Sequence, residues 1–271
     1  MITFPNAKIN LGLNIVERRP DGYHNIETVF YPIPLTDVLE IVPADTLSLT
    51  CYGNKVDCPP EKNLVMKAYH LLQQRCDLPP VAIHLYKHIP DGAGLGGGSS
   101  DAAHTLKMLN EMFDIGISDA DLASMAATLG ADCAFFIYNR PMLATGIGDV
   151  LSPVDLSLQG KTLLLVKPPM GVDTRTAYSR VTPQQPTMLL ADIIKSPIGS
   201  WDGLLVNDFE PSVFSSIPQL WLIKAQLLDA GAQYAAMSGS GSTMFGIFDN
   251  DKLADTAADT FADYTTFVLK F

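Results

Sequence analysis

Hydrophobic and polar residues alternate near the start of the chain, which predicts a half-buried β-strand. Apolar residues occupy every second position of the segment Ile9–Ile15, and a period of two is typical of a strand with one face in the core. The turn-forming segment Arg18–Gly22 follows, and a second apolar run extends over Ile26–Ile33. We therefore expect a strand, a loop and a returning strand in this part of the chain.

The later apolar runs predict a regular succession of strands and helices. Further strands are expected at residues 37–42, 46–52, 81–87, 162–167, 235–237, 244–248 and 265–270. Helices are expected after the capping residue Asn63, over 99–112, from Ser118 to near Gly130, over 219–230 and over 251–262. The last elements follow the order strand, helix, paired strands, helix and strand, which predicts a split βαβ unit. The segment Thr182–Ser200 has no regular pattern and is expected to include exposed loop.

The composition is that of a globular protein rather than a disordered one. Hydrophobic residues make up 47% of the 271 positions and charged residues 17%, so the chain can form one large domain or two smaller ones. No apolar stretch approaches the roughly 20 residues that cross a bilayer, and the N-terminal residues show no signal peptide. The four cysteines and five histidines follow no disulfide or zinc spacing. We expect a cytoplasmic protein without a membrane partner.

The formal net charge of −11 argues against nucleic acid as a partner, because that charge repels a polyanion. The same field repels any phosphorylated substrate. Such a substrate must therefore be held by backbone N–H groups and a few cations close to it, as at a glycine loop that opens a helix.

The most informative stretch is the glycine-rich segment Pro90–Ser100, which lies between a predicted strand and a predicted helix. It contains five glycines in the seven residues from Gly92 to Gly98, and glycines at this density cost stability unless the backbone must approach another group closely. Converging N–H groups and the positive end of the following helix can hold phosphate oxygens. The segment lacks the Gly-Lys-Ser/Thr of a Walker A loop and the third glycine of a dinucleotide fingerprint. We interpret it as a loop for the phosphates of ATP, with a flexible surface turn as the alternative.

A second loop of small residues, at positions 238–243, lies between two predicted strands. Its sequence, Ser-Gly-Ser-Gly-Ser-Thr, also occurs in ordinary hairpins and is weak evidence alone. Beside the first loop it becomes a candidate wall of the same phosphate site.

Three stretches together resemble the signature regions of the GHMP kinases. They are Ala7–Leu11 with Arg19–His24, the loop and helix start Pro90–Ala103, and Met237–Gly241. The resemblance covers nearly the whole chain, and the order and combination of the motifs are specific. It implies an α+β fold of two domains. Residues 1–155 would form a ribosomal S5 domain 2-like N-terminal domain for ATP binding and catalysis, and residues 156–271 a ferredoxin-like C-terminal domain.

Within this family, the strings Lys-Ile-Asn-Leu and Asp-Gly-Tyr-His and the extended glycine loop are similar to the branch that phosphorylates a cytidine diphosphate-linked methylerythritol. The resemblance implies transfer of the γ-phosphate of ATP, with Mg²⁺, to the 2-hydroxyl of that substrate by a monomer or weak homodimer. It implies Lys8 and Asp132 as the catalytic pair. The residues implied for ATP are Asn63, Pro90, Asp91, Gly92, Ala93, Gly94, Leu95, Gly96, Gly97, Gly98, Ser99 and Ser100. Those implied for the acceptor are Asn10, Tyr23, His24, Thr174 and Tyr178, with the rings of Tyr23 and Tyr178 holding the cytosine.

Two other interpretations stay open. A different GHMP kinase would act on a mevalonate-like or sugar-like alcohol, for which the segment Asp21–His24 would have no cytosine to recognise. A catalytically inactive nucleotide-binding protein on the same fold would not need both Lys8 and Asp132. One departure from the family pattern, Cys133–Ala134 in place of the usual Val-Pro, affects only the fine positioning of Asp132.

Overall fold

The computed structural model describes residues 1–56 and 58–271. The chain packs into two compact units, each built from several segments. Unit 1 comprises Met1–Lys8, Leu35–Asp91 and Gly96–Arg140, and unit 2 comprises Ile9–Pro34, Gly92–Leu95 and Pro141–Phe271. The units interleave along the chain, and the domain boundary expected after residue 155 stays a prediction.

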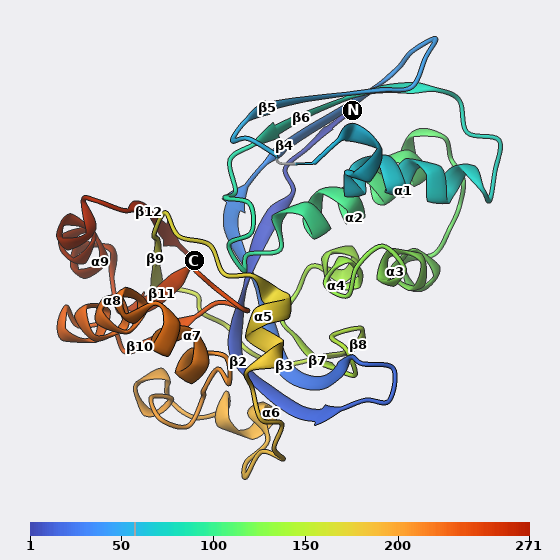
Figure 1. The fold of residues 1–271 in the computed structure, drawn as a ribbon. Coiled ribbons are helices and arrows are strands. Elements are labelled where there is room, and N and C mark those ends of the chain that lie inside the picture. The colour runs from blue at the N-terminus through green and yellow to red at the C-terminus, as the bar shows by residue number, and fades with distance from the viewer. Residues whose placement is uncertain (57) are drawn as a thin grey trace. The chain divides into compact units, whose positions relative to one another are not determined.

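Unit 1 is a four-stranded sheet with helices packed on it (Figure 1). The strand order is β1 (Ile2–Thr3), β4 (Val38–Pro43), β6 (Val81–Lys87) and β5 (Ser48–Gly53), and only β5 and β6 are parallel to each other. The helices are α1 (Leu64–Gln73), α2 (Gly97–Met112), α3 (Asp119–Ala127) and α4 (Cys133–Tyr138). Helix α2 lies at the centre, in contact with α1, α3, α4 and β4.

The starts of three helices follow from their capping residues. The Asn63 side chain accepts a hydrogen bond from the backbone N–H of Val65 at 2.9 Å, and Ser118 Oγ accepts one from Asp121 N–H at 3.2 Å. Both predicted caps are confirmed. Helix α2 starts two residues earlier than predicted, because Gly96 adopts φ +72° and turns the loop directly into the helix.

Unit 2 contains two four-stranded sheets. The first has the order β2 (Asn6–Arg18), β3 (His24–Thr36), β7 (Met142–Thr145) and β8 (Val150–Pro153), and a few residues of its two long strands belong to unit 1. The sequence predicted β2 and β3 as a strand and its return but missed β7 and β8, whose four residues each are too short to show a period. The prediction that β2 is half-buried is wrong, because every residue from Ala7 to Ile15 is buried. Polar side chains of β2 are buried with hydrogen-bond partners instead, as Asn14 is with Glu27.

The second sheet of unit 2 has the order β10 (Tyr234–Met237), β11 (Met244–Phe248), β9 (Thr162–Lys167) and β12 (Thr265–Lys270), with every neighbouring pair antiparallel. Helix α8 (Pro218–Asp229) is the last helix between β9 and β10, and α9 (Asp251–Ala258) lies between β11 and β12. This arrangement confirms the split βαβ unit and the ferredoxin-like fold. Leu164 and Val166 of β9 share one core cluster with Leu227 of α8 and Ala254 of α9, so both helices cover the same face.

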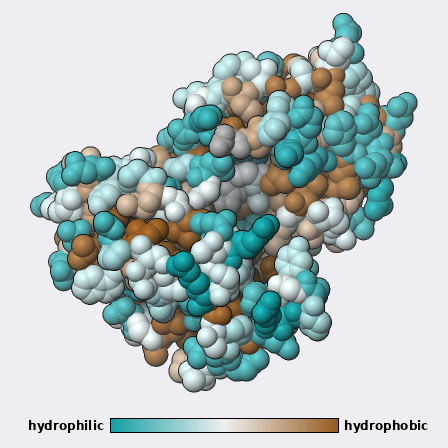
Figure 2. Space-filling model, in the orientation of Figure 1, coloured by the Kyte–Doolittle hydropathy of each residue, from teal (hydrophilic) through white to brown (hydrophobic). Residues whose placement is uncertain are grey.

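The remaining helices of unit 2 are short and were not predicted. They are α5 (Thr174–Ser179), α6 (Leu190–Ile193) and α7 (Glu210–Ser216). Within the described residues, no helix has the length and apolar character needed to cross a membrane. On the face shown in Figure 2, hydrophilic residues dominate and hydrophobic residues form separate patches.

Candidate active site

Lys8 and Asp132 form an ion pair in unit 1. Lys8 Nζ lies 3.2 Å from Asp132 Oδ2, although the two residues are far apart in the sequence. The lysine side chain is 3% exposed, and the carboxylate, at the start of α4, is 33% exposed. A buried ammonium therefore holds a carboxylate that solvent or a ligand can reach.

The ion pair lies against the N-terminus of α2. A Cβ atom added to Gly96 would come within 3.2 Å of Lys8 Cε and 3.0 Å of Phe136 Cζ. Only glycine fits there, because φ is +72° as well. The first N–H groups of a helix have no intrahelical acceptor and mark its positive end. The structure thus combines a lysine, an accessible carboxylate and a helix N-terminus, which together can bind and orient a phosphate.

The middle of the glycine loop packs against the second loop within unit 2. Gly94 has φ +76°, and a Cβ atom on it would lie 2.0 Å from the carbonyl oxygen of Ser238. Ser238 Oγ donates a hydrogen bond to Gly94 O at 2.8 Å, and Thr243 N–H donates to Ala93 O at 3.4 Å. The predicted proximity of the two loops is confirmed. The glycine loop is therefore a packed structure and not a flexible surface turn.

Two buried residues that the sequence did not single out hold the second loop in place. Asn207 Nδ2 donates to Met237 O and to Gly239 O, both at 2.8 Å. Glu210 accepts the backbone N–H of Met237 at 2.8 Å with one oxygen and Lys224 Nζ at 2.6 Å with the other. They come from an irregular segment and a helix of seven residues, where no periodic pattern could reveal them.

Asn10 is buried beside the second loop. Its backbone N–H donates to Ser238 Oγ at 3.3 Å, and its side chain donates to Thr28 Oγ1 at 3.0 Å. The residue thus helps to shape the loop, and direct contact with a substrate stays a prediction.

His24 and Tyr178 lie together in unit 2. Their ring centroids are 5.0 Å apart and the rings are inclined by 20°, a stacked arrangement. Burial, and then the charge of Arg18, lower the pKa of His24 below its ordinary value of 6.5. The imidazole is therefore neutral near pH 7, with one nitrogen that donates and one that accepts.

The other residues expected to bind the acceptor are more exposed. The Tyr23 side chain is 63% exposed, and its backbone N–H donates to Asp21 Oδ1 at 3.0 Å in a local turn. Thr174 Oγ1 lies 2.8 Å from Ser240 Oγ, which places α5 beside the second loop. The structure brings Tyr178 together with His24, and the sandwich of cytosine between Tyr23 and Tyr178 stays a prediction.

Asn63 lies at the same end of unit 1 as the start of α2. The neighbouring Leu64 is the nearest side chain to Gly98, with its Cδ1 3.9 Å from the position of an added Cβ atom. The carbonyl oxygen of the Asn63 side chain caps α1, and the NH₂ group of the same side chain is the group that could donate to an adenine.

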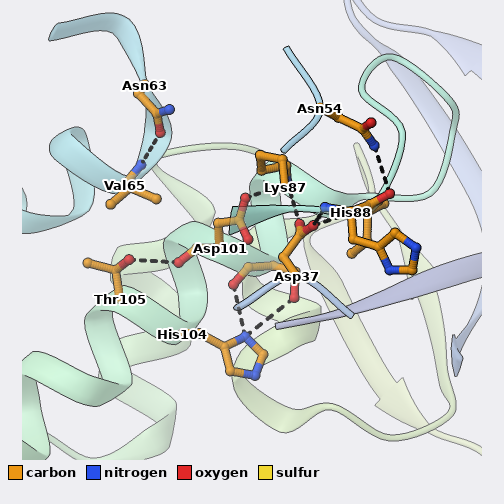
Figure 3. A network of polar contacts seen from close by, with 11 residues as sticks. Asp37, Asn54, Asn63, Val65, Lys87, His88, Asp101, His104 and Thr105 are labelled. Atoms are coloured by element: carbon orange, nitrogen blue, oxygen red, sulfur yellow. Dashed lines mark hydrogen bonds and ion pairs between the residues drawn. The ribbon is translucent and has the colours of Figure 1, made fainter. Parts of the chain in front are cut away.

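Three charged residues that the sequence did not single out lie buried together (Figure 3), beside the first turn of α2 at the end of the glycine loop. Lys87 Nζ donates to a carboxylate oxygen of Asp37 and, at 2.7 Å, to Asp101 Oδ2. A signal was present, because the alternation in Val81–Lys87 places Lys87 on the buried face of its strand. A buried lysine needs a carboxylate partner.

Comparison with known proteins agrees with the resemblance of the sequence motifs to those of the GHMP kinases. Residues 63–140 match the GHMP kinases N terminal domain and residues 190–264 match the GHMP kinases C terminal domain. A 4-diphosphocytidyl-2-C-methyl-D-erythritol kinase of Bacteroides fragilis is 57% identical over 256 residues, 93% of each chain. One of Porphyromonas gingivalis is 52% identical over 264 residues, 96% of each chain. A crystal structure of 4-(cytidine 5'-diphospho)-2C-methyl-D-erythritol kinase superimposes with a TM-score of 0.84 at 31% identity, covering 99% of this chain and 98% of the other.

Proposed function

Because the chain belongs to the GHMP kinase family, we propose that it uses ATP to phosphorylate the 2-hydroxyl of 4-diphosphocytidyl-2-C-methyl-D-erythritol. This reaction belongs to the non-mevalonate route to isoprenoid precursors. Relatives at 52–57% identity that carry the name of this kinase support the choice of acceptor.

The observation that carries the proposal is the position of the Lys8–Asp132 pair. The carboxylate is 3.2 Å from the ammonium and partly exposed, and the lysine stem touches the N-cap of α2 at Gly96. A kinase needs a group that orients the acceptor hydroxyl close to the group that binds the transferred phosphate. An inactive nucleotide-binding protein would not need this arrangement.

In the proposed reaction, Asp132 accepts the proton of the attacking hydroxyl or orients that hydroxyl by a hydrogen bond. Lys8 fixes the carboxylate and contributes positive charge where the phosphoryl group passes. The glycine loop supplies N–H donors, which compensate locally for the net charge of −11.

The glycines let the loop backbone pack against neighbouring protein atoms more closely than side chains would allow, and a backbone held in this way supports the proposal that its N–H groups bind the phosphates of ATP. An added Cβ atom at Gly94, Gly96 or Gly97 would lie 2.0 Å, 3.0 Å or 2.9 Å from the nearest neighbouring atom. Within the described part of the chain, no group of three His, Cys, Asp or Glu side chains could hold a metal ion. We therefore propose that Mg²⁺ arrives with ATP, where it neutralises phosphate charge.

For the acceptor, we propose that His24 recognises the cytosine edge, because its neutral imidazole can donate and accept a hydrogen bond at once. Tyr23 and Tyr178 offer aromatic faces to the base, and Asn10 and Thr174 complete the set. A cytoplasmic location, a monomer or weak homodimer, and the absence of a nucleic-acid partner belong to the same proposal.

ADP release from ATP, measured with each candidate alcohol, tests the proposal. The cytidyl substrate should support turnover, whereas mevalonate and sugar alcohols should not. Asp132→Ala should abolish turnover while the affinity for ATP stays within about threefold of the wild type. Near-normal turnover by this variant would overturn the role of Asp132, and turnover with mevalonate alone would overturn the acceptor.

A further inference from the structure

The buried charges beside the first turn of α2 have no part in the proposed chemistry. Lys87 comes from the end of β6, Asp37 directly precedes β4, and Asp101 lies in the second turn of α2 (Figure 3). Two carboxylates share one ammonium. With both carboxylates ionised, the cluster carries a net negative charge beside a loop that would receive a polyanion.

The cluster holds both ends of the loop. On the upstream side, Asp37 Oδ1 accepts the backbone N–H groups of His88 at 2.6 Å and Ile89 at 2.8 Å, the two residues before Pro90. On the downstream side, Asp101 directly follows the loop and is tied to Lys87 at 2.7 Å. The same ammonium group therefore links the strand that enters the loop to the helix that leaves it.

The first turn of α2 rests directly on this cluster. A Cβ atom on Gly97 would lie 3.3 Å from Lys87 Nζ and 2.9 Å from Ile89 Cγ2. The ammonium group therefore lies next to the helix backbone whose N–H groups would face the phosphates of ATP. A change of charge in the cluster therefore acts on the loop across a short distance within the protein.

Asp101 is the member that can change its charge. Its Oδ1 has no hydrogen-bond partner among the described residues. Burial raises the pKa of Asp101 to about 7, although the charge of Lys87 acts to lower it. The negative charge of Asp37 also raises the pKa of Asp101, and Asp101 in turn raises the pKa of Cys51 of β5. His104 lies three residues further along α2. Burial lowers the pKa of His104, so this imidazole is neutral in the same range.

We propose that Asp37, Lys87 and Asp101 are positioning residues for the phosphate-binding loop, and that Asp101 takes up a proton when ATP binds. The proposal rests on the proposed function, in which this loop receives the triphosphate. With Asp101 protonated, Lys87 balances Asp37 alone, and the cluster becomes neutral beside the loop. By linkage, ATP then binds more tightly to the form with Asp101 protonated, and the affinity for ATP falls as the pH rises past neutrality.

Titration calorimetry of the full chain with a non-hydrolysable ATP analogue tests this proposal without relying on turnover. Measurements in buffers of different ionisation enthalpy give the number of protons taken up. For the wild type we expect proton uptake near neutrality and a loss of affinity between about pH 6 and about pH 8.5, tenfold for each pKa unit by which binding shifts Asp101.

Asp101→Asn is the decisive variant, because an amide oxygen still accepts from Lys87 but the group no longer titrates. We expect the uptake that belongs to Asp101 to vanish and the affinity profile to flatten, leaving only the titration of the analogue itself. Asp208→Asn is the matched control, since burial also raises the pKa of Asp208, whose carboxylate accepts the backbone N–H of Ile15 in unit 2. This control should keep the wild-type profile.

Asp101→Ala separates positioning from charge. Loss of the hydrogen bond to Lys87 should lower the affinity for the ATP analogue at least about tenfold at every pH. The affinity for cytidine diphosphate should stay unchanged. Wild-type proton uptake in Asp101→Asn, or equal losses for both nucleotides in Asp101→Ala, would overturn the proposal. If Asp101→Ala does not fold, the Asp101→Asn profile still decides. A wild type that fails to bind the ATP analogue at all overturns the proposed function instead.

Discussion

Replacement of Asn207 by Ala tests whether this residue holds the second loop in place. Asn207 is 3% exposed, and its side chain makes three hydrogen bonds to backbone groups. It donates to Met237 O and Gly239 O at 2.8 Å each, and its oxygen accepts Phe209 N–H at 3.0 Å. The variant leaves two buried carbonyl groups and one N–H group without these partners.

The expected loss of stability follows from that count. A buried polar group left without a partner costs about 1–3 kcal/mol, and partial entry of water reduces the sum for three adjacent groups. We expect Asn207→Ala to lower the free energy of unfolding by about 3–5 kcal/mol, a large share of the about 5–15 kcal/mol that domains possess. Because Ser238 donates to Gly94 O, the loosened loop should also raise the KM for ATP.

Urea unfolding followed by tryptophan fluorescence measures this loss, since Trp201 is fully buried in unit 2. Asn110→Ala is the matched control, because the Asn110 side chain also pairs with backbone groups, the C=O and N–H of Ile117 at 3.0 and 2.9 Å, but lies in unit 1. It should lower stability while leaving the KM for ATP of the folded enzyme unchanged. An Asn207→Ala protein with the urea midpoint and the ATP KM of the wild type would refute the reasoning.

Three further predictions concern the loop and the acceptor. Gly94→Ala places a Cβ atom on a residue with φ +76°, 2.0 Å from Ser238 O. The backbone conformation alone costs about 1–2 kcal/mol, so the variant should lose more stability than this and show a higher KM for ATP. Unchanged urea unfolding would contradict this prediction. The neutral form of His24 prevails above its lowered pKa, so the KM for the cytidyl substrate should rise only once the pH has fallen below the ordinary histidine pKa of 6.5. His24→Gln should lose that rise, and a variant that retains it would exclude His24 as the cause. If the Tyr23 ring stacks on the base, Tyr23→Ala should lower the affinity for the cytidyl substrate at least about tenfold and the affinity for ATP less than about twofold. Equal losses of affinity for both ligands would remove Tyr23 from the acceptor site.

Much of the fold followed from the sequence because its long elements carry a clear period. The strand Val81–Lys87 and the strand Thr265–Lys270 were predicted with the bounds that the structure shows. The polar positions of β2 misled the burial prediction, because alternation alone does not tell a solvent-facing polar residue from a buried one with a partner. Lys8 is such a residue, since its partner Asp132 lies far away in the sequence.

The site could be predicted only where chemistry is concentrated in a motif. The glycine loop could be identified by its glycine content. Lys8 and Asp132 could be identified by the resemblance of their motifs to those of the GHMP kinases. Asn207 and Glu210 act through their contacts with the backbone at Met237, and such contacts leave no trace in local sequence. Lys87 was visible on the buried face of its strand, but its partners Asp37 and Asp101 become evident only once β4, β6 and α2 are packed.

The sharing of one ammonium by two carboxylates also constrains how the sequence can change during evolution. Loss of Lys87 leaves two buried carboxylates without their shared cation. Loss of either carboxylate changes the negative charge that the lysine balances. Single replacements at these three positions should therefore be rare among relatives, because each one leaves the remaining buried charges unbalanced. Asp37 and Lys87, 50 residues apart in the chain, should then be inherited as a unit together with Asp101.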